Sequence, residues 1–338
     1  MKKRRTSLKD IALRLNVSIA TVSRALRGSH EVGEEMKQKI RMLAEEMNYR
    51  PNPFAQSLRK DAPRIIGVVV PNLVTHYYAA VLDGIEDYAR QEGYSVFCGN
   101  THESCEAERQ TLDNFLSMHV EGIIACLAQD TVDYSYFEQI NKMDVPLVFF
   151  ARTCLPELFS HVVADGDVAA QKATMHLLNT GSKRIAFIGG PNHLDMVKRR
   201  KHGYLEALRE KKIEIDRSLV ICNKIDFDIA YEAVRDLLKR PDRPDAILAF
   251  NDIITFAAFE AIKNVGLRIP DDVALIGFTD SESTAYVTPR LSVIADQAYL
   301  QGRKACELLM RNIKGDRRIY REVVPMKLVI RDSSDKTR

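Results

Sequence analysis

Ser7-Leu8-Lys9-Asp10-Ile11-Ala12 and Val17-Ser18-Ile19-Ala20-Thr21-Val22-Ser23-Arg24-Ala25-Leu26 are the two stretches of sequence that decide the fold. In the first, a serine is followed three residues later by an acid, a capping box that starts a helix. A second serine opens the second stretch, and in both stretches the apolar residues recur at helical spacing. The pattern predicts two short helices separated by a tight turn at residues 16–17.

A third helix is indicated by Met36, Ile40, Leu43 and Met47, which are spaced by four, three and four residues. Two short helices with a tight turn, braced by a third, form a helix-turn-helix, whose second helix enters the major groove of DNA. We expect Val22 and Leu26 of that helix to point inward with Val17. The residues then left on its outer face are Ile19, Ala20, Ser23 and Arg24.

Positive charge is concentrated in the same part of the chain. Residues 1–60 carry 14 lysines and arginines against six acids, a net of +8, whereas residues 61–338 carry 35 against 40, a net of −5. This asymmetry indicates a polyanionic partner for the N-terminal part alone. A solvated basic tail would account for residues 1–5, but the charge continues through the segment with helical spacing.

The chemistry of this segment suggests how it would contact DNA. Arg24 can donate two hydrogen bonds to O6 and N7 of a guanine in the major groove. Ser7, Ser18 and Thr21 stand at helix starts, where hydroxyls and free backbone N–H groups suit phosphate oxygens.

Residues 1–52 resemble the LacI family of bacterial transcription regulators. The resemblance is carried by residues 8–12, by residues 17–26 apart from Ile19, and by Tyr49-Arg50-Pro51-Asn52. It departs at Arg27, where the family usually has Asn, and at Gly33, which replaces Ser at the start of the third helix but is tolerated as an N-cap. It implies a helix-turn-helix DNA-binding domain over 1–50, called the head below. The expected DNA-contacting residues are Ser7, Ser18, Ile19, Ala20, Thr21, Ser23, Arg24, Arg27, Asn52, Ala55 and Leu58.

Residues 51–63 are a predicted hinge. Pro51 and Pro53 end the preceding helix, and residues 54–60 are too few for a helix that is stable alone in water. The resemblance implies that this segment folds only on the operator, as a pair in a dimer. Leu58 would then enter the minor groove and open the central base step. The alternative is that Leu58 packs on the rest of the chain as a linker residue.

From residue 64 to 331, short apolar runs alternate with helical patterns. The alternation predicts doubly wound parallel sheets with helices on both faces, and the runs are too many for one sheet, so two lobes with a ligand cleft are expected. Helices are predicted over 78–92, 168–180 and 253–265. Buried strands are predicted over 65–71, 94–99, 122–127, 147–150, 184–189, 246–249, 273–278 and 291–295.

Nearly all of 64–331 resembles the sugar-binding, periplasmic-binding-protein-like body of the same family. The likeness implies three crossovers between lobes, near 164–165, 292–296 and 325–327. The N-lobe is then about 64–164 plus 296–325, the C-lobe about 165–292 plus 326–331, and 332–338 a polar tail. Aromatic faces and bidentate polar side chains are the usual grip on a polyol. The implied effector-binding residues are Thr75, Tyr77, Tyr78, Asn100, Arg152, Asp165, Arg200, Asn251, Asp252, Thr279 and Asp280.

Two departures bear on the ligand. Ala151 and Thr279 stand where many relatives have Asp, which suggests a ligand with negative charge, a different hydroxyl pattern or no small ligand. Some effector-binding candidates also have structural alternatives: Tyr77 and Tyr78 as helix core, Arg200 in the solvated basic run 198–201, and Asp165 as a helix cap.

Composition excludes several classes of protein. The chain is 46% hydrophobic and 28% charged, as soluble proteins are, and no run approaches the ~20 apolar residues of a membrane helix. The basic N-terminus lacks the apolar core of an export signal, so we expect a cytoplasmic protein. The six cysteines are scattered without a C-x-x-C pair, and the eight histidines are dispersed, which favours reduced thiols and argues against a metal or cofactor.

The sequence therefore predicts a transcription regulator, most simply a repressor of carbohydrate-use genes that responds to a sugar or sugar derivative. No leucine heptad follows residue 331, so we expect a homodimer on a pseudo-palindromic operator. The alternatives are a solute-binding protein, which would need an export signal and no basic head, and a regulator whose acidic or phosphorylated ligand is a co-repressor. An enzyme is disfavoured, because Gly189-Gly190-Pro191 lacks a phosphate-loop pattern and no G-x-S-x-G is present.

Overall fold

The computed structural model describes residues 6–49 and 64–336. It divides into two units, residues 1–63 and 64–338, which are described separately below. The predicted hinge at 51–63, with the proposed DNA contacts of Asn52, Ala55 and Leu58, lies outside the described residues. Within the described residues, no helix is long and apolar enough to cross a membrane, and no group of three or more His, Cys, Asp or Glu side chains is placed to hold a metal ion.

The first unit contains the three predicted helices, α1 (Leu8–Leu15), α2 (Ile19–Leu26) and α3 (Glu34–Glu46). Both bonds of the capping box are present, since Ser7 N–H donates to the Asp10 carboxylate over 2.7 Å and Asp10 N–H donates to Ser7 Oγ. Asn16 ends α1 in the left-handed conformation, and Ser18 Oγ accepts a hydrogen bond from Thr21 N–H at the start of α2. Local side-chain chemistry thus sets both helix starts, as the sequence predicts.

The core of this unit is small. Val22 is fully buried, as expected, but its partner on α2 is Ala25, whereas Leu26 is only partly buried. Positions 22 and 25 lie on one helical face, and residue 26 is turned about 100° from residue 25, to the edge of that face. Leu26 nevertheless packs against the same core, as does Val17, so the prediction that both point inward with Val22 is confirmed. The other buried apolar residues of the unit are Ile11, Ala12, Val32, Ile40 and Ala44.

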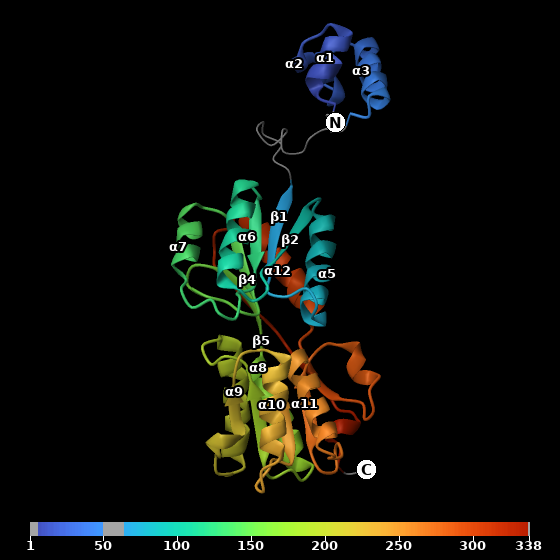
Figure 1. Cartoon of the computed structure of the whole chain (residues 1–338). Coiled ribbons are helices and arrows are strands. Elements are labelled where there is room, and N and C mark those ends of the chain that lie inside the picture. Colours follow the sequence, from blue (N-terminus) through green and yellow to red (C-terminus); the bar gives the residue numbers. More distant parts are fainter. Residues whose placement is uncertain (1–5, 50–63, 337–338) are drawn as a thin grey trace. The chain divides into compact units, whose positions relative to one another are not determined.

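The second unit contains two six-stranded sheets, which confirms the doubly wound α/β fold (Figure 1). All strand pairs are parallel except β10–β12, which is antiparallel. The N-lobe sheet has the order β11 (Arg321–Val324), β5 (Ser160–Ala164), β4 (Leu147–Phe150), β3 (Gly122–Ala125), β1 (Ile65–Val70), β2 (Ser95–Asn100). The C-lobe sheet has the order β12 (Lys327–Val329), β10 (Ser292–Ala295), β9 (Ala274–Phe278), β8 (Ala246–Ala249), β6 (Ile185–Gly189), β7 (Val220–Cys222).

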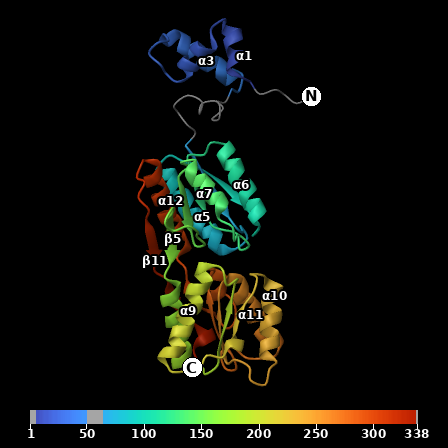
Figure 2. The same ribbon diagram turned by 90° about the vertical axis from the view of Figure 1, so that its left-hand side faces the viewer.

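Helices cover the sheets of both lobes (Figure 2). The N-lobe has α5 (His76–Gln91), α6 (Cys105–Ser117), α7 (Ser135–Lys142) and α12 (Ala298–Ile313). The C-lobe has α8 (Gly166–Asn179), α9 (Asp195–Glu210), α10 (Phe227–Leu238) and α11 (Asp252–Asn264), with 3-10 turns at Arg217–Leu219, Glu282–Ala285 and Asp332–Ser334. The chain passes from one lobe to the other between β5 and α8, between β10 and α12, and between β11 and β12.

Edge strands account for most of the differences from the predicted strands. β2 was predicted as buried, but it is partly exposed along its whole length because it has a neighbour on one side only. For the same reason Cys98 on β2 is exposed, whereas Cys126, Cys154 and Cys306 are buried thiols. The strands missed by periodicity are β5, with polar Ser160 and His161, and the short edge strands β7, β11 and β12.

The C-terminal polar segment is part of the C-lobe rather than an appended tail. Ser333 and Ser334 are fully buried. Ser333 Oγ donates to the Leu275 carbonyl over 2.6 Å and accepts from Ser292 N–H over 2.8 Å. The Ser333 hydroxyl thus bonds backbone groups of β9 and β10, and Ser334 Oγ donates to Ser292 Oγ. Composition alone could not distinguish this role from a solvated tail.

In the N-lobe, α5 and α12 pack backbone against backbone (Figure 1). A Cβ atom on Gly84 would lie 2.1 Å from the Tyr299 carbonyl oxygen, and one on Gly302 would lie 2.0 Å from the Val81 carbonyl oxygen. No side chain fits at either position unless the helices separate, so the two glycines set the spacing of these helices.

We therefore expect Gly302→Ala to lower the free energy of unfolding by about 1–3 kcal/mol through overpacking, although alanine is the better helix former. The matched control is Ala79→Ser, which adds one atom at an exposed position of α5 and should stay within about 0.5 kcal/mol. Urea unfolding followed by circular dichroism measures both changes. Equal stability of the two variants would contradict the close packing.

Candidate functional site

The outer face of α2 is the candidate surface on the first unit. Ile19 is 48% exposed, Ala20 and Arg24 are exposed, and Ser23 and Thr21 are partly exposed. Ser18 is exposed at the start of α2, where its hydroxyl lies 2.8 Å from that of Thr21. The structure thus places these candidates together on one face, and their contact with DNA stays a prediction.

The two arginines of α2 are held by neighbours within the unit. Arg24 Nε lies 3.1 Å from the Glu31 carboxylate, and both side chains are about half exposed. Arg27, the C-cap of α2, donates from Nε to the Ser23 carbonyl over 3.1 Å. Ser7, in contrast, uses its hydroxyl within the capping box, where it lies 2.7 Å from Asp10 Oδ2. The guanidinium predicted to contact bases is therefore paired with an acid in the free unit.

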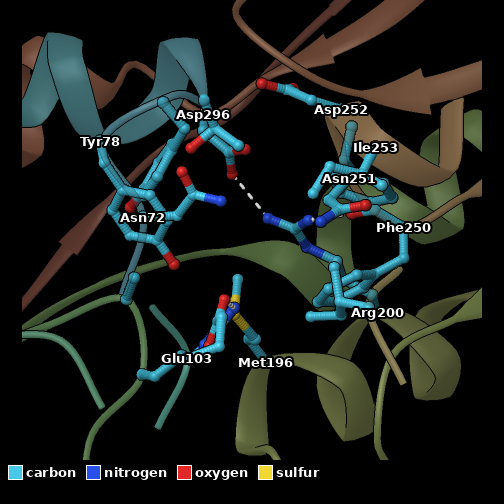
Figure 3. Close-up of a pocket in the computed structure, with 16 residues that line it drawn as sticks. Asn72, Tyr78, Glu103, Met196, Arg200, Phe250, Asn251, Asp252, Ile253 and Asp296 are labelled. Atoms are coloured by element: carbon cyan, nitrogen blue, oxygen red, sulfur yellow. Dashed lines mark hydrogen bonds and ion pairs between the residues drawn. The ribbon is translucent and has the colours of Figure 1, made fainter. Parts of the chain in front are cut away.

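The candidate ligand site is a cavity between the two lobes of the second unit (Figure 3). It encloses about 550 Å³ of space free of protein atoms, a volume that includes open solvent. Residues from the carboxyl ends of strands in both sheets meet there. Its lining residues are Asn72, Thr75, Tyr77, Tyr78, Glu103, Ala151, Arg152, Met196, Arg200, Ile225, Phe250, Asn251, Asp252, Ile253, Phe278 and Asp296.

Several of the sequence-predicted effector residues are brought together in this lining, and the others are not. Those in the lining are Thr75, Tyr77, Tyr78, Arg152, Arg200, Asn251 and Asp252. Those outside it are Asn100, Asp165, Thr279 and Asp280.

The four residues outside the lining bind the protein's own backbone. Asn100 Oδ1 accepts from His102 N–H, and Thr279 Oγ1 accepts from Ser281 N–H. Asp165 Oδ1 accepts from Met326 N–H over 2.6 Å, which ties two of the crossovers together. The Asp280 carboxylate accepts from the N–H groups of residues 297 and 298 at the start of α12. Asp280 thus caps a helix, whereas the Asp165 side chain makes no cap hydrogen bond to α8, although Asp165 is the N-cap residue of that helix.

The polar lining residues that sequence reasoning missed are Asn72, Glu103 and Asp296. Asp296 follows β10 directly, Asn72 follows β1 by two residues, and Glu103 follows β2 by three. Because strand ends of a parallel sheet face its ligand crevice, their position after a predicted strand was an available signal.

Arg152 is buried, at 5% exposure, and makes a bidentate pair with Glu103. Its Nη1 and Nη2 donate to the two carboxylate oxygens over 2.6 and 3.0 Å, and Nη1 also donates to the Leu127 carbonyl. Arg152 Nε and Thr75 Oγ1, however, are buried without a hydrogen-bond partner. Buried polar groups are nearly always hydrogen-bonded, so these two atoms at the cavity point to a ligand that supplies their partners.

Arg200 of α9 makes the second buried pair, with Asp296 beyond β10. Its Nη2 donates to Asp296 Oδ1 over 2.6 Å, and its Nη1 donates to the Phe250 carbonyl (Figure 3). The guanidinium carbon also lies 4.0 Å from the ring centroid of Phe278 and 4.9 Å from that of Phe250. A cation so enclosed by aromatic rings is fixed in place.

Negative charge accumulates next to this pair. Burial, with smaller contributions from Asp280 and Asp252, raises the pKa of Asp296 to about 7 even though Arg200 opposes the rise. Burial likewise raises the pKa of Asp252, against a hydrogen bond with Thr279. The cavity therefore holds more carboxylate than its arginines neutralise.

A hydrogen-bonded path leads from the Arg152–Glu103 pair to a contact between the lobes. Gln129 N–H donates to Glu103 Oε2 over 2.8 Å. The Gln129 carbonyl lies 2.7 Å from His193 Nε2, and its side-chain oxygen accepts from Ile225 N–H over 2.9 Å. His193 and Ile225 belong to the C-lobe, so one residue of the N-lobe connects both lobes to the cavity's ion pair.

Comparison with protein families gives two matches. Residues 7–52 match the model described as bacterial regulatory proteins, lacI family. Residues 174–334 match the model described as a periplasmic binding protein-like domain.

Similar proteins span nearly the whole chain. The HTH-type transcriptional repressor CytR of Escherichia coli K12 is 31% identical over 91% of this chain and 90% of its own length. The ribose operon repressor of Bacillus subtilis 168 is 32% identical over 91% and 92%. Among solved structures, a transcriptional regulator CelR–cellobiose complex has a TM-score of 0.73 at 28% identity, covering 97% of this chain and all of that one.

The raised pKa of Asp296 leads to a testable dependence of stability on pH. Its carboxyl stays protonated up to about pH 7 in the folded state but titrates near its ordinary value of 3.8 when unfolded. The folded state thus binds more protons between these values, so the free energy of unfolding falls as pH rises through this window. Asp296→Asn, which cannot lose a proton, should flatten that slope in urea unfolding measured from pH 4 to 8.

The control for this experiment is Glu138→Gln, which removes an exposed carboxylate on α7 and should keep the wild-type slope. A slope that Asp296→Asn leaves unchanged would show that Asp296 titrates normally.

Proposed function

Since the chain belongs to the LacI family of bacterial regulatory proteins, it is a DNA-binding transcription regulator, and we propose that a small polyhydroxylated ligand held between its lobes controls its hold on DNA. The observation that carries the ligand part is the cavity lined from both lobes, in which Arg152 Nε and Thr75 Oγ1 are buried without a partner. The protein binds this ligand and does not transform it.

On DNA, the outer face of α2 enters the major groove. Arg24 leaves Glu31 and donates to a guanine, while Ser18 and Thr21 meet phosphates at the start of the helix. Two copies of the chain bind the two halves of a pseudo-palindromic operator as a homodimer. The net charge of +8 over residues 1–60 supports this assignment of the head.

Control by the ligand follows from the position of the cavity. A ligand that touches both lobes has different affinities for different arrangements of those lobes, and it therefore shifts the equilibrium between them. The repressors of similar sequence, one of them named for a ribose operon, support repression of genes for carbohydrate use. A solute-binding transport protein is disfavoured, because such a protein does not need a DNA-binding head.

The DNA part of the proposal is tested by selecting bound duplexes from a random library with the full chain and titrating the selected duplex at several salt concentrations. Affinity should fall steeply with salt. Arg24→Ala should weaken the binding free energy for the selected duplex by about 1–3 kcal/mol. It should also reduce the ratio of the affinity for the selected duplex to the affinity for random DNA. Glu31→Gln should raise affinity by up to about fivefold, because it releases Arg24 from an exposed pair.

Two matched variants control for charge alone. Arg14→Ala removes an exposed arginine from α1, and Glu35→Gln removes an exposed acid from α3. Both should leave the preference for the selected duplex intact. Failure to enrich any sequence, or an Arg24→Ala variant that discriminates as wild type does, would contradict this assignment of α2.

A further inference from the structure

We infer that the cavity between the lobes selects an uncharged, hydroxyl-bearing ligand and rejects its acidic derivatives, because Glu103 and Asp296 already occupy both guanidinium groups there. The inference rests on the proposed function, since it concerns the ligand of the same cavity. It makes Glu103 and Asp296 the residues that determine ligand charge.

The first observation is the charge of the lining. Three carboxylates, those of Glu103, Asp252 and Asp296, face two guanidiniums, those of Arg152 and Arg200. No lysine or histidine is present among the described residues that line the cavity. Above about pH 7, where Asp296 is ionised, an added anion would therefore enter a site with three carboxylates against two guanidiniums.

The second observation is how completely the two cations are engaged. Arg152 gives both terminal nitrogens to Glu103, and the side-chain exposures of this pair are 5% and 17%. An anionic ligand could form a bidentate pair with Arg152 only by displacing Glu103. That carboxylate would then be buried without its counter-ion, which opposes such binding strongly.

Arg200 is closed to anions in a different way. Aromatic rings of Phe250 and Phe278 lie against its guanidinium, and Asp296 stands at its edge. The side-chain exposures of this pair are 3% and 9%. Because carboxylates and phosphates bind a guanidinium at its edge, Asp296 takes the place that an acidic ligand would need.

An uncharged polyol finds partners of both kinds. Arg152 Nε–H is a donor without an acceptor, and the Thr75 hydroxyl is likewise unpartnered. Asp296 Oδ2 accepts no hydrogen bond from any described residue, so it is open to a ligand hydroxyl. A hydroxyl both donates and accepts, whereas an ionised carboxylate or phosphate oxygen only accepts and would face these carboxylates with repulsion.

The structure also explains why the sequence suggested the opposite charge. Ala151 and Thr279 lack the carboxylates that many relatives have at these positions, which suggested an acidic ligand, a different hydroxyl pattern or no small ligand. The missing charge is replaced from elsewhere in the chain, because Glu103 comes from the loop after β2 and Asp296 from the crossover after β10. These two carboxylates, which are distant in sequence from the two substitutions, argue against the acidic ligand.

The first experiment compares uncharged compounds with acidic counterparts. Calorimetry of the full chain at pH 8, where Asp296 is ionised, would use D-ribose with ribose 5-phosphate, cellobiose with cellobionate, and D-glucose with glucuronate. In each pair that binds, the uncharged member should bind at least tenfold more tightly. An acidic member that binds equally or more tightly would overturn the inference and leave the proposed ligand cavity standing. Binding by no member would overturn the polyhydroxylated ligand of the proposed function.

The second experiment does not depend on the identity of the ligand. It measures the binding of inorganic phosphate and compares it with the binding of chloride at the same ionic strength. Wild type and the exposed control Glu138→Gln should show no phosphate binding that depends on Arg200. Asp296→Asn should gain such binding at least tenfold, because it frees Arg200, and Asp296→Asn with Arg200→Ala should lose it again.

Glu103→Gln provides an independent variant, which should gain phosphate binding through Arg152 in the same way. The inference would be overturned if wild type bound phosphate in a way that depends on Arg200. It would also be overturned if circular dichroism showed both carboxylate variants to be folded and neither bound phosphate more tightly than wild type. The arginine dependence separates binding in the cavity from binding at the basic head.

Discussion

Parallel strands of both sheets end at one cleft, and this constraint places most of the polar groups that line the cavity. Asn72, Arg152 and Glu103 follow strands of the N-lobe, whereas Asn251 and Asp296 follow strands of the C-lobe. No short-range signal brings these side chains together, since they are spread over more than two hundred residues. The topology does so, because the carboxyl edge of a parallel sheet is where successive loops converge.

Buried charge then determines what the cleft can hold. Neither arginine is free to pair with a ligand, because Arg152 is paired at 2.6 Å with the half-buried Glu103 and Arg200 at 2.6 Å with the buried Asp296. What remains for a ligand is a mixture of single donors and acceptors together with aromatic surface. The same pairs also connect binding to conformation, since Glu103 holds Gln129 and Gln129 reaches His193 and Ile225 in the other lobe. A ligand that moves Glu103 acts on a contact between the lobes.

Local chemistry was predictable from the sequence, and long-range pairing was not. The capping box of Ser7 and Asp10 and the exposed face of α2 follow from spacing alone. The family resemblance placed Arg200, which lies on α9, and Asn251, which follows β8, and both line the cavity. The sequence could not distinguish Asp280 from a ligand-binding acid, because its capping of α12 depends on a helix that begins 18 residues later. Glu103 and Asp296 were missed, since their arginine partners lie 49 and 96 residues away. Ser333 was predicted to belong to a polar tail, because its hydrogen-bond partners Leu275 and Ser292 are also distant in sequence.

The most direct test of the account couples the two units. Once a cavity ligand is known, the affinity of the full chain for its selected duplex should be measured with and without that ligand, in wild type, in Arg200→Ala and in Arg209→Ala, an exposed control on the same helix. The account predicts that the ligand changes DNA affinity in wild type and in Arg209→Ala and has no effect in Arg200→Ala. A ligand that occupies the cavity but leaves the DNA affinity of wild type unchanged would contradict it.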